Sequence, residues 1–311
     1  MEKKRCAVFC CRGLGDGIIS LILSNNLSKV GYEVVTFHLF LKSLSDWFPG
    51  LELRDFPTLE ILEQELANYD RIFVFFESGR LADIIQMCQA KFPDKLTVLN
   101  PIATNKWDYP YWEQSRFNGR ISLADNLQQY CQTMLSIPSA TKENGVVVPA
   151  SFQMKKYPKR VVIHALSSRE GKNWSIEKFI ALADRLKQEG YDPYFIVSED
   201  ERKAFPIQGS MVPGLHSLTE LAGFVAESGF MIGNDSGIGH LASSLGIPTV
   251  TICRRKNIAA FWRPGWAKGA VVLPPRYLIN FRGLRCRDKY WKRFVSVSKV
   301  MKAFYQLANS C

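Results

Sequence analysis

Residues 229–240 read Gly229-Phe-Met-Ile-Gly-Asn-Asp235-Ser-Gly-Ile-Gly-His240, an apolar run that changes abruptly to small and polar residues. The run predicts a buried strand over Gly229–Asn234, and the residues after it predict a helix over Ser236–Leu245 that packs closely on a sheet. A further apolar run, Pro248–Cys253, predicts the next strand. Strands that alternate with helices indicate a parallel sheet covered on both faces.

The same alternation extends through the rest of the chain. In the second half it predicts strands at Arg160–Leu166 and Tyr194–Glu199, helices at Ser175–Glu189 and Ser217–Ser228, and a terminal helix at Trp291–Asn309. In the first half it predicts strands at Arg5–Cys11, Glu33–Phe40, Arg71–Glu77 and Lys95–Asn100, and a helix at Gly17–Val30 that Gly31 closes.

The chain is long for one compact core, and residues 137–159 are rich in proline with little periodicity. We therefore expect two α/β domains, residues 1–150 and 151–290, joined by a linker at 137–159. The terminal helix, residues 291–311, is expected to pack back toward the first domain. Ligands of open α/β sheets bind beyond the carboxyl ends of the strands, so the loops there, facing a cleft between the halves, should carry the function.

The composition is that of a globular protein, with 47% hydrophobic and 22% charged residues. No apolar run approaches the ~20 residues that span a bilayer, and the start lacks the apolar core of a signal peptide, so we expect a cytoplasmic protein. Eight cysteines without a C-x-x-C pair indicate reduced thiols. Four histidines, none at ligand spacing to a cysteine, argue against a zinc site.

Positive charge is concentrated near the end of the sequence. The net charge is +11, and residues 254–311 contain fourteen Lys or Arg against one acid, Asp288. Such a cluster attracts anions, which could be nucleic acid, acidic lipid or a phosphorylated substrate. A solubilising surface is the alternative.

The first loop whose residues could take part in binding or catalysis is Arg12-Gly-Leu-Gly-Asp16-Gly17, between a predicted strand and a helix. Its glycines let the backbone turn tightly near a ligand. Ile18 stands where the dinucleotide-binding G-x-G-x-x-G motif needs its third glycine, which disfavours a nicotinamide oxidoreductase. Asp16 is a candidate general base, and capping of the helix N-terminus is its structural alternative.

The second loop, His164–Trp174, carries hydroxyls and cations to a helix N-terminus. Ser167 and Ser168 can donate hydrogen bonds to phosphate oxygens, and Lys172 supplies a positive charge. An ordinary polar connection is the alternative for this loop.

The third loop lies within the stretch quoted first. The first N–H groups of the helix from Ser236 and its positive dipole end suit a diphosphate. His240 is near enough to donate to the same anion, and a histidine satisfied in the core is the alternative. No D-x-D pair occurs in the sequence, so Lys172 and this helix, rather than a metal ion, must neutralise a leaving group.

These blocks, in this order, resemble the bacterial heptosyltransferases of glycosyltransferase family 9. Gly15-Asp16 matches the family's Gly-Asp, and Ser167–Trp174 resembles its hydroxyl-rich Lys-x-Trp loop. Asp235–Leu241 resembles its Asp-(Thr/Ser)-Gly-x-x-His-Leu motif. The set covers nearly the whole chain, and it implies the GT-B fold, in which two Rossmann-like domains face each other across a cleft.

The resemblance implies an inverting transfer of a heptose or related sugar from ADP-heptose to the lipopolysaccharide inner core, with no metal and no cofactor. Asp16 would take the proton of the attacking hydroxyl. Asp235 would bind the sugar, and Glu201 the ribose. The implied donor-binding residues are Ser167, Ser168, Lys172, Glu201, Asp235, Ser236, Gly237 and His240. The implied acceptor side consists of Arg12, Gly13, Gly15 and Trp107.

Three departures from the family pattern bear on specificity. Cys10-Cys11 replace a basic or hydroxylated residue after the first strand, Arg254–Asn257 replace a Gly-Pro-Thr stretch, and Ser236 replaces threonine. Another donor sugar, a protein acceptor and a non-catalytic nucleotide-binding protein are therefore the alternatives. The basic residues Arg254–Lys256 and Arg282–Arg293 are expected to steer the chain to an anionic glycolipid on the cytoplasmic face of the inner membrane, and not to nucleic acid.

Overall fold

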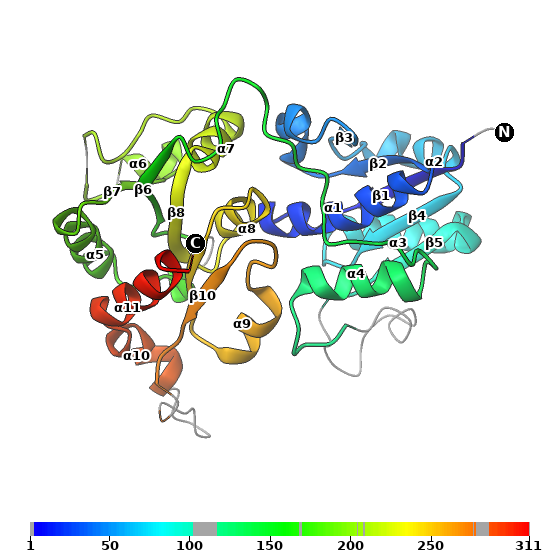
Figure 1. Ribbon diagram of the computed structural model, residues 1–311. Coiled ribbons are helices and arrows are strands. Elements are labelled where there is room, and N and C mark those ends of the chain that lie inside the picture. Colours follow the sequence, from blue (N-terminus) through cyan, green and yellow to red (C-terminus); the bar gives the residue numbers. More distant parts are fainter. Residues whose placement is uncertain are drawn as a thin grey trace. The chain divides into compact units, whose positions relative to one another are not determined.

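The structure, a computed structural model, describes residues 3–101, 117–167, 170–203, 205–207, 209–275, 277 and 286–310 (Figure 1). The chain divides into two compact units, Met1–Val147 and Val148–Cys311. The described residues of each unit form one five-stranded parallel sheet with helices on both faces. The α/β architecture expected from the sequence is confirmed.

The first unit has the strand order β3-β2-β1-β4-β5. Its strands are β1 (Arg5–Phe9), β2 (Glu33–Phe37), β3 (Glu52–Arg54), β4 (Arg71–Phe75) and β5 (Leu96–Leu99). Its helices are α1 (Leu14–Lys29), α2 (Leu59–Ala67), α3 (Arg80–Lys91) and α4 (Leu123–Thr133), with 3-10 turns η1 (Leu41–Trp47) and η2 (Pro93–Lys95). This is the order of a Rossmann half, in which the direction of the connections reverses between β1 and β4.

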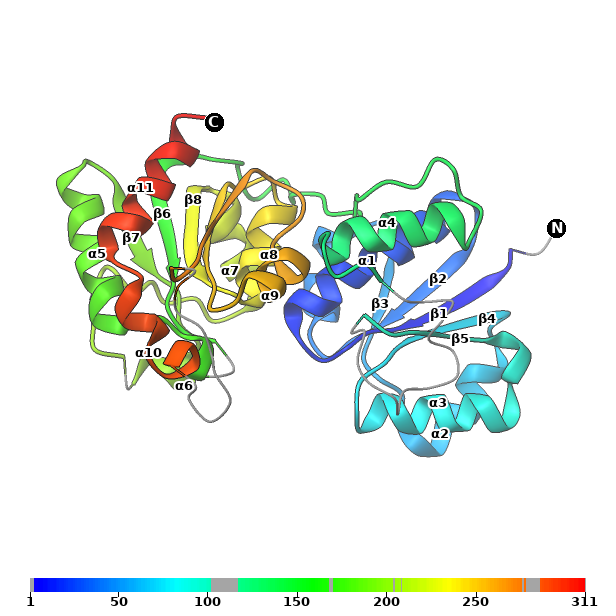
Figure 2. The same cartoon turned by 90° about the horizontal axis from the view of Figure 1, so that it is seen from below.

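The strands of this unit are apolar on both faces because each face is covered. Phe9, Phe37 and Val74 pack with α2 and α3 in one core cluster. On the opposite face α1 packs against α4, as Figure 2 shows. Cys10 lies beside Ser20 of α1, whereas Cys11 packs against the α2–α3 cluster. These two neighbouring thiols therefore point to opposite sides of the sheet.

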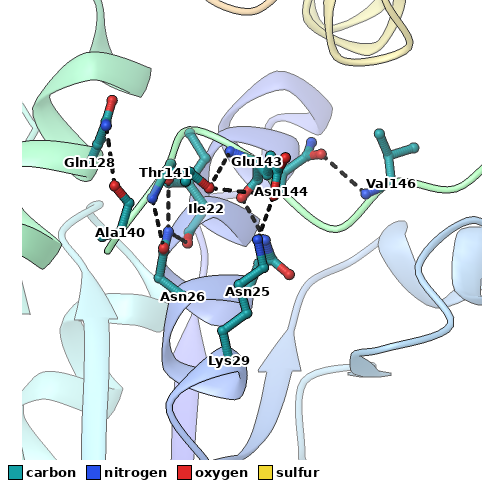
Figure 3. A network of polar contacts seen from close by, with 10 residues as sticks. All are labelled: Ile22, Asn25, Asn26, Lys29, Gln128, Ala140, Thr141, Glu143, Asn144 and Val146. Atoms are coloured by element: carbon teal, nitrogen blue, oxygen red, sulfur yellow. Dashed lines mark hydrogen bonds and ion pairs between the residues drawn. The ribbon is translucent and has the colours of Figure 1, made fainter. Parts of the chain in front are cut away.

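A network of amide side chains ties the start of the predicted linker to α1 (Figure 3). Asn26 donates from Nδ2 to the Thr141 carbonyl at 2.9 Å and accepts from the Thr141 N–H at 3.0 Å. Asn25 donates to the Glu143 carbonyl at 2.8 Å, and Lys29 forms an ion pair with the Glu143 carboxylate. This part of the segment is therefore held in the first unit.

The second unit has the strand order β10-β9-β8-β6-β7. Its strands are β6 (Tyr157–His164), β7 (Asp192–Phe195), β8 (Ser228–Asn234), β9 (Thr249–Ile252) and β10 (Gly269–Val272). Its helices are α5 (Ile176–Gln188), α6 (Glu199–Arg202), α7 (Leu218–Ala226), α8 (Gly237–Ser244), α9 (Lys256–Trp262), α10 (Cys286–Phe294) and α11 (Val297–Ala308), with the 3-10 turn η4 (Glu170–Lys172). In this order the connections reverse between β6 and β8, which is where a ligand is expected.

The terminal helix differs from the prediction because it is two helices. α10 ends at Phe294, and Ser296 caps α11 by accepting from Lys299 N at 3.2 Å. The apolar stripe of α11, which includes Met301 and Phe304, is buried in one cluster with α5 and the second sheet. Its apolar face is thus used inside the second unit.

Element boundaries shift mainly at the carboxyl ends of the strands. β1, β2 and β4 end two or three residues earlier than the apolar runs suggested. The remaining residues, among them His38 and Glu77, belong to the loops at the ligand-binding edge. In the described part of the chain, none of the helices has the length and apolar character needed to cross a bilayer.

Candidate functional site

In the first unit, the loop after β1 enters α1 at the reversal of strand order. Gly13 is the N-cap of α1, and Asp16 lies in its first turn. A Cβ atom at Gly13 would come within 2.3 Å of Asp16 Oδ2, so the carboxylate folds back over the Gly13 backbone. Asp16 is partly exposed there. It therefore receives the dipole stabilisation of a helix N-terminus and stays accessible to a substrate.

His38, directly after β2, anchors this loop and is fully buried. Its Nδ1 accepts from the Phe40 N–H at 3.0 Å, so the ring proton is on Nε2, which donates to the Gly13 carbonyl at 3.1 Å. Gly17 is required beneath the ring, since a Cβ there would lie 2.6 Å from Nε2. Burial lowers the pKa of His38 because the charged form loses its hydration.

The sequence analysis missed His38 because it placed the residue inside a strand. Its position in the sequence could have indicated a role at the site. A histidine at the carboxyl end of the strand paired with β1 shares the sheet edge of Asp16.

An ion pair joins the two strands that flank the reversal point. Arg12 donates from its backbone N to Glu77 Oε2 at 3.1 Å, and its guanidinium Nε lies 3.4 Å from the same oxygen. The Arg12 side chain is 66% exposed, so this contact contributes little stability and leaves the guanidinium accessible to an anionic acceptor.

In the second unit, Asn234 brings two of the predicted blocks together. At the end of β8 it is buried, its Oδ1 accepts from the Trp174 N–H at 2.9 Å, and its Nδ2 donates to the Ala165 carbonyl at 2.6 Å. The loop after β6 is thereby fixed to the start of α8. Both blocks lie at the point where the strand order reverses.

Lys172 and Asp235 meet across these blocks, with Lys172 Nζ 3.1 Å from Asp235 Oδ2. The lysine side chain is 36% exposed and the aspartate 12%. Ser167 donates its hydroxyl proton to Asn173 Oδ1 at 2.6 Å. The Lys172 ammonium has two further N–H donors that a phosphate could use, and Ser167 must rotate its hydroxyl to donate to it.

α8 begins at Gly237, with Ser236 as its N-cap. His240, in the second turn, is 5% exposed, and within the described structure its Nδ1 has no hydrogen-bond partner. The ring also bonds to the backbone of Trp262, a contact that favours the protonated form and so uses Nε2–H as donor. Burial lowers the pKa of His240 to about 4. The neutral ring presents a lone pair at Nδ1, which accepts a hydrogen bond, and donation from Nδ1 to an anion would require uptake of a proton.

Glu201 has a structural task. It forms a capping box at α6 with Ser198, whose N–H donates to Glu201 Oε2 at 2.9 Å. Its charge also favours protonation of His164, so Glu201 lies within electrostatic reach of the β6 end. Two predicted site residues, Ser168 and Trp107, lie outside the described residues.

The basic residues after β9 approach the same loop. The guanidinium of Arg255 makes two bonds to the Asp288 carboxylate, at 3.2 and 2.6 Å, and Arg254 Nε lies 3.4 Å from it. Arg254 Nη1 would lie 4.0 Å from a Cβ placed on Gly171. Two guanidinium groups thus share one carboxylate, and one of these groups lies near the residue that precedes Lys172. No group of three His, Cys, Asp or Glu side chains that could hold a metal ion occurs in the described ranges.

Known proteins resemble this chain in sequence profile and in fold. The profile of glycosyltransferase family 9 (heptosyltransferase) matches residues 102–274, more than half of the chain. A glycosyl transferase family 9 structure from Veillonella parvula has a TM-score of 0.75 at 17% identity, with 100% of this chain and 99% of that chain covered. No curated protein sequence matches the chain.

Two Escherichia coli enzymes share the fold. Heptosyltransferase WaaC with ADP gives a TM-score of 0.68 at 12% identity, covering 97% of this chain and 99% of that one. ADP-heptose lps heptosyltransferase II gives 0.69 at 16%, covering 98% and 99%. The chain therefore belongs to glycosyltransferase family 9, the heptosyltransferase family, and is a glycosyltransferase with the GT-B fold.

Proposed function

We propose that this chain transfers a heptose or related sugar from ADP-heptose to an anionic glycolipid, the lipopolysaccharide inner core, with inversion at the anomeric carbon. The observation that carries the proposal is the start of α8. There a helix N-terminus and the half-buried Lys172–Asp235 pair come together at the reversal point of the second sheet, and the unpartnered Nδ1 of His240 can accept a hydrogen bond from a hydroxyl of the donor. Solved structures of the fold relative WaaC contain ADP and ADP-2-deoxy-2-fluoro heptose.

In the proposed reaction the donor diphosphate lies on the first-turn N–H groups of α8. Lys172 exchanges its contact with Asp235 for a phosphate oxygen, and Asp235 then accepts hydrogen bonds from the sugar hydroxyls. Asp16 removes the proton of the acceptor hydroxyl as its oxygen attacks the anomeric carbon. The bond between that carbon and the diphosphate breaks, and ADP leaves with the electron pair, stabilised by the helix and Lys172.

Thermal unfolding with a donor panel tests the donor assignment, because a ligand that binds only the folded state raises the melting temperature. ADP-heptose should protect the protein, whereas UDP-sugars and GDP-sugars should not. Protection by a UDP-sugar or GDP-sugar alone would change the assigned donor but would still agree with a sugar-transferase function. Protection by none of them would contradict a nucleotide-sugar site.

A further inference from the structure

Ser236 departs from the usual behaviour of a serine N-cap. Such a side chain normally accepts a hydrogen bond from the second or third N–H of its helix. Four serine N-caps of this chain do so: Ser122, Ser198, Ser217 and Ser296. A fifth, Ser175, does not, because its hydroxyl donates to the Glu177 carboxylate. Ser236 makes no such bond within the described structure, and its hydroxyl instead lies 2.9 Å from His164 Nδ1. The Ser236 hydroxyl therefore bonds to His164 and does not cap α8.

His164 is held in place for this contact. It is the last residue of β6 and pairs in register with Gly233 of β8. A Cβ atom at Gly233 would lie 2.8 Å from the His164 carbonyl oxygen and 3.3 Å from its Cβ, so the two strands approach closely here. Burial lowers the pKa of His164 to about 4, so the ring is neutral at physiological pH and its contact with Ser236 is a neutral hydrogen bond.

An independent observation indicates that a ligand group able to donate a hydrogen bond binds beside the open helix end. His240 of α8 is 5% exposed, and its Nδ1 is an unpartnered buried polar atom of the described structure. Its ring interacts electrostatically with Asp235 and Lys172, which flank the helix start. A buried polar atom without a partner is costly unless a ligand or water supplies one.

We propose that His164 is a positioning residue that holds the Ser236 hydroxyl off the N-terminus of α8, so that the first-turn N–H groups stay available for the donor diphosphate. This inference rests on the proposed function, since it requires a diphosphate at α8. Without His164, the Ser236 hydroxyl turns to accept from the N–H of Ile238 or Gly239. It then competes with the ligand for the same donors.

A double-mutant cycle with ADP as the probe tests this competition. Titration calorimetry on the full chain should show that His164→Phe weakens ADP binding about five- to tenfold, which is the loss expected from one competing cap. In a Ser236→Ala background the same substitution should have almost no effect, because no hydroxyl is left to compete. His164→Asn, whose side-chain amide places a polar atom at the same distance from Cα as the histidine Nδ1 and can still bond to Ser236, should recover most of the affinity lost in His164→Phe.

The outcomes separate this inference from the proposed function. Equal losses in both backgrounds would overturn the inference alone, because His164 would then act without Ser236. Failure of the unmodified protein to bind ADP would overturn the proposed donor site and the inference with it. His216→Phe, on the exposed loop before α7, is the matched control and should leave ADP affinity unchanged. If His164→Phe does not fold, His164→Leu serves in the same cycle, since its side chain has no polar atom to bond to Ser236.

Discussion

Asp16 meets two requirements that oppose each other. A carboxylate in the first turn of a helix is stabilised by about 0.3–1 kcal/mol, which makes it a weaker base. A base in an inverting transfer needs only enough proton affinity to accept the proton of a hydroxyl that becomes acidic as its oxygen bonds to carbon. In the proposed role of Asp16 as base, the position of the carboxylate, set by Gly13 and His38, is therefore the main requirement.

Asp16→Asn preserves shape and removes the base. We predict unchanged ADP binding and a loss of turnover of about 10²–10⁴-fold, the range usual for a general base. Initial rates of ADP release with donor and acceptor, together with calorimetry, provide the measurement. Asp46→Asn, an exposed change in η1, is the control. Undiminished turnover in Asp16→Asn would refute the assignment of the base.

Among the elements, the first turns of α1 depend on the contact between Gly17 and His38. Gly17→Ala would place a methyl group 2.6 Å from the buried ring, and we predict a destabilisation of about 1–3 kcal/mol in urea unfolding. Gly50→Ala is the matched control, because no atom lies within 4 Å of the added Cβ there. A Gly17→Ala protein as stable as the Gly50→Ala protein would show that His38 does not hold the loop rigidly.

The element α8 should also make stability depend on pH. The pKa of His240 falls from 6.5 to about 4 on folding, so below pH 6.5 the unfolded chain binds a proton that the folded chain does not. The contribution of neutral His240 to the free energy of unfolding is therefore fully present above pH 6.5 and is lost as the pH falls toward 4. At pH 5 this linkage costs about 2 kcal/mol.

His240→Gln should remove this part of the pH dependence. Urea unfolding at pH 7 and pH 5 should show a smaller loss of stability in the variant than in the unmodified protein. Identical losses in the two proteins would mean that His240 is not held neutral in the folded state.

The repeating elements could be predicted from the sequence, because buried parallel strands are continuous apolar runs such as Phe-Met-Ile in β8. The glycine-rich and hydroxyl-rich blocks could be placed after the carboxyl ends of β1, β6 and β8, because each block directly follows such an apolar run. Short elements such as β3 and β10 have only three and four residues and give little periodic signal. Contacts between residues distant in the sequence could not be predicted from local patterns. His38 bonds to the carbonyl of Gly13, 25 residues away, and the Ser236 hydroxyl bonds to His164 instead of capping its own helix.

At the scale of the whole molecule, the charge is strongly asymmetric. Residues 254–311 carry fourteen basic residues and one acid, and that acid, Asp288, is shared by two arginines. We predict that the protein sediments with anionic phospholipid vesicles at low salt and is released at ~1 M salt, where the Debye length is about 3 Å. Sedimentation that does not change with salt would contradict electrostatic steering to an anionic surface.

The donor site at α8 is the central claim, and the affinity for ADP of the Lys172→Met variant tests it most directly. The account predicts that calorimetry will show binding weakened by about 10- to 100-fold, the usual value of a charge-assisted contact. Lys187→Met, an exposed change near the end of α5, should bind ADP as the unmodified protein does. Equal ADP affinities for the Lys172→Met and Lys187→Met proteins would contradict the account.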